Sequence, residues 1–332
     1  MEYRRLGKTG LEASVIGIGS WQLSGPLTVD GRPDGFADIG EAAAVDLIRA
    51  LGERGVNFID TAPIYGDGVG ETRIGKAIRG QRDRWLVSTK FGMTLDGAGR
   101  RRLDLSPAAV RRNIEDSLRR LATDHVDLYL FHSDPAPAEI APCLELLGRL
   151  KAEGKIRAAG VSTDSTETLS ALIAAGGIDA CLLTHSLYRE PQAQFDLAMQ
   201  AGLGILKRGV LEFGLLSGNY FRARASYGRD DIRRTTIDHL DSRRFAAFRA
   251  LVPPGASMPA FAVRYVLDRP DTHVIIYGGK SLDQYQAAFD AVAMTPLAPA
   301  MIERVAETRR RLARSLLVPR ALRKMKRVLR LA

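Results

Sequence analysis

The feature that most constrains the fold is a regular alternation of short apolar runs with helical segments along almost all of the 332-residue chain. The runs are continuous rather than interrupted by polar residues, which is typical of strands buried on both faces of a parallel sheet. Eight runs fit this description, at residues 15–19, 57–60, 85–90, 126–132, 157–162, 180–185, 204–208 and 273–277. Eight βα units of this size predict an α/β fold, a (β/α)8 TIM barrel, with an open doubly wound sheet as the main alternative.

Local signals at the ends of these segments support the same division of the chain. Ser106-Pro107 is a good N-cap and first-turn pair for a helix that ends near Leu121. Residues 2–20 hold two short apolar segments around a glycine-bounded turn, which predicts an N-terminal β-hairpin before the first barrel strand. No linker or low-complexity stretch interrupts the βα rhythm, so residues 1–303 are expected to form one barrel domain.

The net charge of +10 is concentrated in the last part of the chain, residues 304–332. This segment holds eleven of the 48 Lys and Arg residues and one of the 38 acids, which leaves 37 of each sign in residues 1–303. The neutral body argues against nucleic-acid binding.

We expect a basic C-terminal helical tail, divided by Pro319 into a helix packed on the barrel and a solvated basic helix. The alternative is an amphipathic basic helix that docks on an anionic membrane, an acidic partner or a phosphorylated or acyl-carrier-bound substrate.

Cysteine usage and hydropathy bear on the compartment. Cys143 and Cys181 stand far apart without metal-ligand spacing, so neither a disulfide scaffold nor a metal site is expected. No apolar run approaches the roughly 20 residues that span a bilayer, and no signal peptide is visible. The sequence therefore predicts a cytoplasmic protein without integral membrane association. It leaves the oligomeric state open, with a monomer as the working expectation.

Polar side chains follow three consecutive predicted strands at the point where each strand ends. They are Asp60, Lys90 and His132, and Tyr65 lies on the loop after Asp60. The carboxyl ends of barrel strands converge on one face, so these four residues are expected to meet. Each has an ordinary alternative explanation, such as a capping Asp, a packed Tyr, a solvated Lys or a buried His. Four such residues at successive strand ends favour a catalytic site.

The chemistry of this set is that of a proton donor. A Tyr hydroxyl has a reference pKa of about 10, and an adjacent ammonium lowers this pKa by stabilising the phenolate. A carboxylate can hold the ammonium in place, and an imidazole can orient a substrate carbonyl oxygen. The set supplies a proton but no electrons, so a hydride must come from a nicotinamide cofactor.

The sequence resembles the aldo-keto reductase family over nearly the whole of residues 1–300. The resemblance is carried, in order, by YRRLGKTGLEASVIGIGSW, GVNFIDTAPIYGDGVGETRIGKAI, WLVSTKF, SLRRLATDHVDLYLFHSDP and GKIRAAGVST. It implies a (β/α)8 barrel and NAD(P)H-dependent carbonyl reduction. It also implies that Tyr65 is the general acid, that Lys90 tunes it, that Asp60 pairs with the lysine and that His132 orients the carbonyl.

The same resemblance implies a set of cofactor-binding positions. They are Gly19, Ser20, Ser162, Thr163, His185, Lys207, Arg208, Gly209, Leu211, Gly278, Lys280, Ser281 and Gln284. Ser162-Thr163 stands where the family has Ser-Asn, Leu182 where it has Gln, and Ala288 where it has Asn. His185 takes the place of the Tyr that stacks under the nicotinamide. Lys207, Arg208 and Lys280 are expected near the cofactor phosphates, so NADPH is the expected cofactor.

The sequence thus predicts an NADPH-dependent oxidoreductase that reduces a ketone or aldehyde to an alcohol. Trp21 and the loops at 22–40 and 212–240 are expected to line the pocket for a small-molecule carbonyl substrate. Two alternatives remain: a non-redox member of the fold, such as a regulatory protein or isomerase with weakened cofactor binding, and a protein that binds polyanions or membrane surfaces through its tail.

Overall fold

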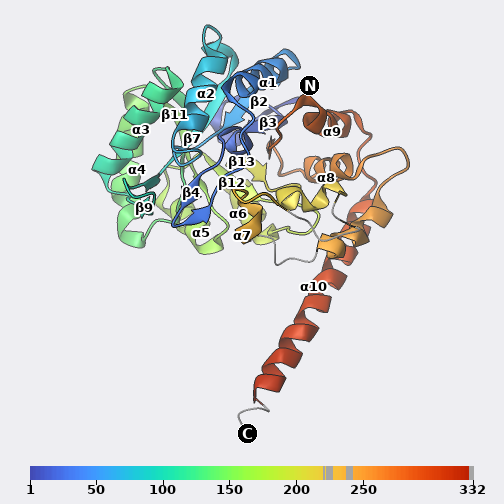
Figure 1. Cartoon of the computed structure of the whole chain (residues 1–332). Coiled ribbons are helices and arrows are strands. Elements are labelled where there is room, and N and C mark those ends of the chain that lie inside the picture. The colour runs from blue at the N-terminus through green and yellow to red at the C-terminus, as the bar shows by residue number, and fades with distance from the viewer. Residues whose placement is uncertain (220, 222–226, 237–241, 329–332) are drawn as a thin grey trace.

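The centre of the molecule is a closed barrel of eight parallel strands surrounded by helices (Figure 1). This computed structural model describes residues 1–219, 221, 227–236 and 242–328. In order around the barrel the strands are β3 (Ile16–Gly19), β6 (Phe58–Asp60), β7 (Leu86–Phe91), β10 (Val126–Phe131), β11 (Ile156–Ser162), β12 (Ala180–Thr184), β13 (Gly204–Arg208) and β14 (Val274–Tyr277). β14 pairs with β3 and closes the barrel, which confirms the TIM barrel over the open sheet.

The helices that cover the barrel follow the predicted alternation. They are α1 (Glu41–Glu53), α2 (Val69–Ile78), α3 (Pro107–Leu121), α4 (Pro137–Ala152), α5 (Thr166–Ala175), α6 (Gln192–Gln200), α8 (Met258–Leu267) and α9 (Leu282–Ala293). The predicted cap of α3 is present, because the Ser106 hydroxyl accepts a hydrogen bond from the backbone N–H of Ala109 at 3.3 Å. The helix expected at 243–251 is instead a 3-10 helix, η5 (Ser242–Leu251), and a short helix, α7 (Arg233–Thr236), precedes it.

Two apolar layers hold the barrel together, one on each face of the strands. The larger layer lies between strands and helices and includes Val87, Phe131 and Ile205. The smaller layer fills the barrel interior and includes Leu86, Leu130 and Leu206. Successive residues of a strand point to opposite faces, so each strand contributes to both layers in alternation. This alternation also decides which polar residues face the mouth of the barrel.

The predicted N-terminal hairpin is present and pairs β1 (Tyr3–Arg5) with β2 (Glu12–Ser14). Its turn packs closely on the start of β13, where a Cβ on Gly7 would lie 2.4 Å from the backbone nitrogen of Gly204. Gly7 also has a φ of +49°, so a glycine is required there. Two further hairpins were not predicted by the sequence: β4 (Thr28–Val29) with β5 (Arg32–Pro33), and β8 (Met93–Leu95) with β9 (Arg101–Leu103).

The C-terminal segment is one helix, α10 (Pro299–Val328), which leaves the barrel as a long projection (Figure 1). The expected division at Pro319 is therefore wrong, because the loss of one backbone N–H does not end the helix here. The beginning of α10 belongs to the packed structure, since Val305 is fully buried and Thr308 nearly so. Within the residues that the structure describes, no helix has the length and hydrophobicity needed to cross a membrane.

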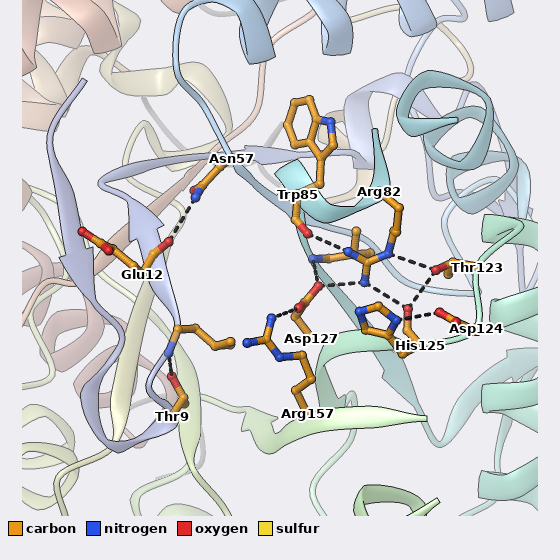
Figure 2. Close-up of polar contacts among 12 residues, drawn as sticks. Thr9, Glu12, Asn57, Arg82, Trp85, Thr123, Asp124, His125, Asp127 and Arg157 are labelled. Carbon is orange, nitrogen blue, oxygen red and sulfur yellow. Dashed lines mark hydrogen bonds and ion pairs between the residues drawn. The ribbon is translucent and has the colours of Figure 1, made fainter. Parts of the chain in front are cut away.

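A buried carboxylate joins neighbouring strands at the N-terminal end of the barrel (Figure 2). Asp127 on β10 accepts hydrogen bonds from the Val87 backbone N–H at 2.8 Å, from Arg82 at 2.8 Å and from Arg157 at 2.7 Å. Arg82 also donates to the Trp85 carbonyl oxygen at 2.6 Å. This face of a TIM barrel carries stability rather than chemistry. The Asp127 cluster therefore fixes how β7, β10 and β11 meet.

Replacing Asp127 with Asn is expected to lower the free energy of unfolding by about 3 kcal/mol, because two arginines lose a buried counter-charge. Chemical denaturation followed by circular dichroism measures this change. Asp116→Asn is the matched control, because Asp116 pairs with Arg119 on the exposed surface of α3 and its loss is expected to cost at most about 0.5 kcal/mol. Equal effects of the two substitutions would contradict the role given to Asp127.

Candidate active site

The last inward-facing residue of each barrel strand forms a ring at the C-terminal mouth. Each lies an even number of residues after a residue of the interior apolar layer, so all of them belong to the inner face of the sheet. The ring consists of Gly19, Asp60, Lys90, His132, Ser162, Thr184, Arg208 and Gly278. The structure therefore brings the three strand-end residues of the predicted catalytic set into one layer.

The centre of the site is a buried ion pair between neighbouring strands. Lys90 Nζ lies 2.7 Å from Asp60 Oδ2, and the two side chains are 1% and 5% exposed. Lys90 also donates to the Thr61 carbonyl oxygen at 2.7 Å, and Asp60 Oδ1 accepts from the Ser88 hydroxyl at 3.0 Å. Both charges are thus paired and hydrogen-bonded, which is the condition for burying them.

Tyr65 extends from the loop after β6 over this ion pair. Lys90 Nζ lies 5.0 Å from the centre of the Tyr65 ring, and the His132 ring stands at 86° to it with centres 5.8 Å apart. Trp21 stacks on the Tyr65 ring, with ring centres 5.7 Å apart and an interplanar angle of 16°. All four predicted catalytic residues and the predicted substrate residue therefore lie together.

The protonation states follow from burial and from the ion pair. Burial raises the pKa of Tyr65, and the charge of Lys90 opposes this rise only in part. Burial alone would lower the pKa of Lys90, but Asp60 and Tyr65 outweigh it and the pKa is raised. Burial, together with the charge of Lys90, lowers the pKa of His132 well below its usual value. At neutral pH, Tyr65 and Lys90 therefore hold their protons and His132 is neutral. Lys90 lowers the Tyr65 pKa, as expected, but burial has the larger effect and the net pKa is raised.

The loop at 21–40 covers the mouth and contacts loops from other strands. Trp21 meets Phe36 edge to face at 5.4 Å and Phe213 at 6.3 Å. The Ile232 backbone N–H donates to the Gly35 carbonyl oxygen at 2.9 Å. The two loops predicted to line the pocket thus meet above Tyr65, although residues 220, 222–226 and 237–240 of the second loop lie outside the described part of the chain.

A group of free backbone donors follows β13. The N–H groups of Gly209, Val210 and Leu211 donate to no other described residue, and Gly209 has a φ of +73°. Successive unpaired N–H groups of this kind suit phosphate oxygens. Residues 209–211 therefore fit the pyrophosphate of a dinucleotide.

The predicted pair Ser162-Thr163 lies at the end of a different strand, β11. Ser162 lies in the ring at the mouth, whereas the buried Thr163 donates its hydroxyl hydrogen to Asp134 at 2.6 Å.

The predicted adenosine segment precedes α9. Lys280 Nζ donates to the Ala37 carbonyl oxygen at 2.9 Å and lies 5.6 Å from the centre of the Phe36 ring. The Lys280 backbone N–H donates to Gln284 Oε1 at 2.9 Å, and Ser281 caps the helix by accepting from Gln284. Ser281 and Gln284 therefore hold the turn that presents Lys280.

Three further predicted cofactor positions lie at the ends of β3 and β14. A Cβ on Gly278 would lie 2.3 Å from Gln22 Nε2, so the Gln22 side chain rests on this backbone. A Cβ on Gly19 would lie 3.1 Å from an Ile276 methyl group. Ser20 is fully buried, and its hydroxyl has no partner in the part of the chain that the structure describes. The three positions thus lie at the mouth but are covered by neighbouring groups, by Gln22 in the case of Gly278.

The structure contradicts two of the predicted cofactor residues. His185 is fully buried against Phe195 and Tyr265, behind the barrel wall. Lys207 is also fully buried, pairs with Asp271 and lies 2.9 Å from the centre of the Phe195 ring. Both residues occupy outward positions of their strands, so they face the helices and not the mouth. His185 cannot stack on a nicotinamide, and Lys207 cannot reach a phosphate.

The sequence reasoning also missed residues that the structure places at the mouth. Thr184 and Asp164 meet Arg208 there, and Phe36 contacts both Trp21 and Lys280. The period-two rule alone identifies Thr184 and Arg208, because Leu182 and Leu206 lie in the interior layer. No comparable signal was available for Asp164 and Phe36, which lie on loops.

Comparisons with known proteins identify the family of the chain. The profile of the Aldo/keto reductase family matches residues 15–310. The aldo-keto reductase YhdN of Bacillus subtilis is 31% identical over 308 residues, which are 89% of this chain and 90% of that protein. The NADH-specific methylglyoxal reductase of Escherichia coli is 28% identical over 303 residues, which are 84% of this chain and 90% of that protein.

Solved structures show the same relationship. The holo form of an aldo-keto reductase from Bacillus halodurans superposes with a TM-score of 0.80 at 27% identity, over 93% of this chain and 96% of that one. The apo form of the same enzyme covers the same shares of both chains with a TM-score of 0.70 at 25% identity. The barrel and the family match together define the class of protein as an oxidoreductase. The chain belongs to the aldo/keto reductase family.

The burial of His185 in the helix-facing layer can be tested through the pH dependence of stability. Burial, only partly offset by Glu190, lowers the pKa of His185 to about 4 from 6.5. Between these values the unfolded chain binds a proton that the folded protein does not, so the free energy of unfolding falls as the pH is lowered. His185→Phe is expected to remove on the order of 3 kcal/mol of this pH dependence. Denaturation at pH 7 and at pH 4 measures it, and an unchanged difference between the two pH values would contradict the assignment.

Proposed function

We propose that this protein reduces an aldehyde or ketone to an alcohol with NADPH, and that Tyr65 donates the proton. The observation that carries the proposal is the buried Lys90 ammonium, which is bound to Asp60 and lies 5.0 Å from the centre of the Tyr65 ring. A cation fixed beside a phenol stabilises the phenolate that forms when the proton leaves. The raised pKa of Tyr65, caused by burial, keeps the proton in place until the substrate is bound.

His132 has a separate part in the proposed reaction. The neutral imidazole stands edge to face against Tyr65 and can donate a hydrogen bond to the substrate oxygen. Its Nδ1 is buried without a partner among the described residues. The substrate oxygen would then be oriented by His132 and protonated by Tyr65. A nicotinamide bound at this mouth would supply a hydride to the carbonyl carbon, and with the proton from Tyr65 the C=O group would become H–C–O–H.

Observations on the backbone support a bound dinucleotide. The unpaired N–H groups of residues 209–211 fit the pyrophosphate, and Lys280 at the start of α9 fits an adenosine phosphate. These two features favour a redox enzyme over a non-redox member of the fold.

The preference for NADPH rests on Lys280. With Lys207 buried and Arg208 held at the mouth, Lys280 is the predicted cation that remains for a 2′-phosphate. It is bound to a neutral carbonyl oxygen of Ala37, a partner that a phosphate would replace with a stronger charge-assisted bond. One relative is named as NADH-specific, so the preference requires a direct test.

Tyr65→Phe is expected to lower kcat for carbonyl reduction by roughly 100- to 10,000-fold, because it removes the general acid. The decrease in NADPH absorbance with a panel of aldehydes and ketones measures the rate. Fluorescence titration of NADPH is the control, and its Kd is expected to change little. Turnover equal to that of the wild type would exclude Tyr65 as the proton donor.

Lys280→Met is expected to weaken NADPH binding roughly ten- to a hundredfold and to leave NADH binding nearly unchanged, because one charge-assisted phosphate contact is lost. Lys76→Met, which removes an exposed ion pair between Lys76 on α2 and Glu41 on α1, is the matched control. Titration of both cofactors distinguishes the cases. If wild type and Lys280→Met show the same ratio of NADPH to NADH affinity, Lys280 is not the phosphate ligand.

A further inference from the structure

A second cation lies in the ring of residues at the mouth, and the proposed proton transfer does not use it. Arg208 ends the inward face of β13, two residues after the interior Leu206. It therefore belongs to the same layer as Lys90 and His132. Lys207, which lies between Leu206 and Arg208 in the sequence, faces outward and is buried behind the barrel wall.

Arg208 is anchored on one side and open on the other. Its Nη2 lies 3.0 Å from Asp164 Oδ2, and the two side chains are 37% and 49% exposed. Asp164 is itself fixed by Thr184, whose backbone N–H donates to it at 3.2 Å and whose hydroxyl donates at 3.0 Å. The other guanidinium N–H groups of Arg208 donate to no described residue. A hydrogen-bonded carboxylate thus anchors Arg208, which keeps N–H groups without a partner in the described part of the chain.

The charge of Arg208 reaches the catalytic groups. Burial is the main cause of the low His132 pKa, and the positive charges of Lys90 and Arg208 lower it further. Burial likewise dominates the Tyr65 pKa, where Lys90 and Arg208 both favour the phenolate. Arg208 is therefore close enough to act electrostatically on any charge that develops beside Tyr65.

The proposed reaction requires a hydride and a proton to reach the two ends of one carbonyl group. A nicotinamide that reacts here would therefore lie beside the Tyr65 hydroxyl, where the charge of Arg208 would act on it. The reduced ring is neutral, and the oxidised ring carries a positive charge. A fixed cation leaves the first unaffected and repels the second.

We propose that the Arg208–Asp164 pair sets the relative affinity of this site for the two oxidation states of the nicotinamide, with Arg208 disfavouring the oxidised form and Asp164 offsetting part of that effect. The inference rests on the proposed function, because it requires a nicotinamide beside Tyr65. It assigns Arg208 to the redox end of the cofactor and not to a phosphate. Its consequence is weaker binding of the oxidised cofactor, which favours product release after reduction.

The test is the ratio of two dissociation constants, that of the oxidised cofactor over that of the reduced one. Contacts common to both forms cancel in this ratio, so a general loss of affinity does not change it. Isothermal titration with NADPH and NADP⁺, and with NADH and NAD⁺, gives the ratio for the wild type, Arg208→Gln, Asp164→Asn and Arg208→Lys.

Arg208→Gln is expected to lower the ratio roughly 3- to 10-fold, the effect of one partly screened unit charge several ångströms away. Asp164→Asn is expected to raise it by a similar factor, because Arg208 then loses its counter-charge. Arg208→Lys retains a cation and is expected to keep a ratio near that of the wild type. Opposite shifts from the two members of one ion pair are not expected from loss of packing or folding.

Ratios that stay constant, or that shift in the same direction in Arg208→Gln and Asp164→Asn, would overturn the inference while leaving the proposed function intact. A wild-type protein that binds neither oxidation state and reduces no carbonyl would instead refute the proposed function, and the inference with it. The titrations together with one assay of carbonyl reduction therefore distinguish the two failures.

Discussion

The ion pair between Lys90 and Asp60 is the interaction on which the rest of the site depends. Two charges in a water-excluded position are costly unless each has a partner, and here each charge has the other as its partner and a further hydrogen bond. The pair couples β6 to β7 at the mouth and keeps a permanent positive charge under Tyr65. The loops above it then determine what reaches that charge. Trp21 stacks on Tyr65, and the 21–40 loop extends from there to Lys280.

The strict alternation of side chains along the strands determines both what the sequence could predict and where it failed. Short apolar runs separated by helices predict a parallel barrel, because both faces of each strand are buried. The same runs place Asp60, Lys90 and His132 at strand ends, so the meeting of these three residues at the mouth could be predicted from the sequence. The family resemblance implies cofactor roles for His185 and Lys207, but a family position alone does not specify which face of the strand a side chain occupies. A shift of one residue moves a side chain from the mouth to the helix layer.

The remaining errors concern features that neither the hydrophobic period of the sequence nor secondary-structure propensity encodes. The hairpins β4–β5 and β8–β9 form in loops, where contacts with other loops decide the conformation. The Asp30 backbone N–H, for example, donates to the Gly99 carbonyl oxygen across these two hairpins. The sign of the Tyr65 pKa shift depends on the balance between burial and one nearby charge, which requires the structure. Pro319 shows the limit of a local rule, since the helix α10 continues through it.

The central claim is that Lys90 acts through Tyr65, so that the two residues form one catalytic unit. A double-mutant cycle on kcat/KM for carbonyl reduction tests it directly, with Tyr65→Phe, Lys90→Met and the double variant compared with the wild type. Residues that act as a unit are not additive, so the double variant is expected to be about as slow as the slower single variant. Losses that multiply in the double variant would show independent contributions and contradict the claim.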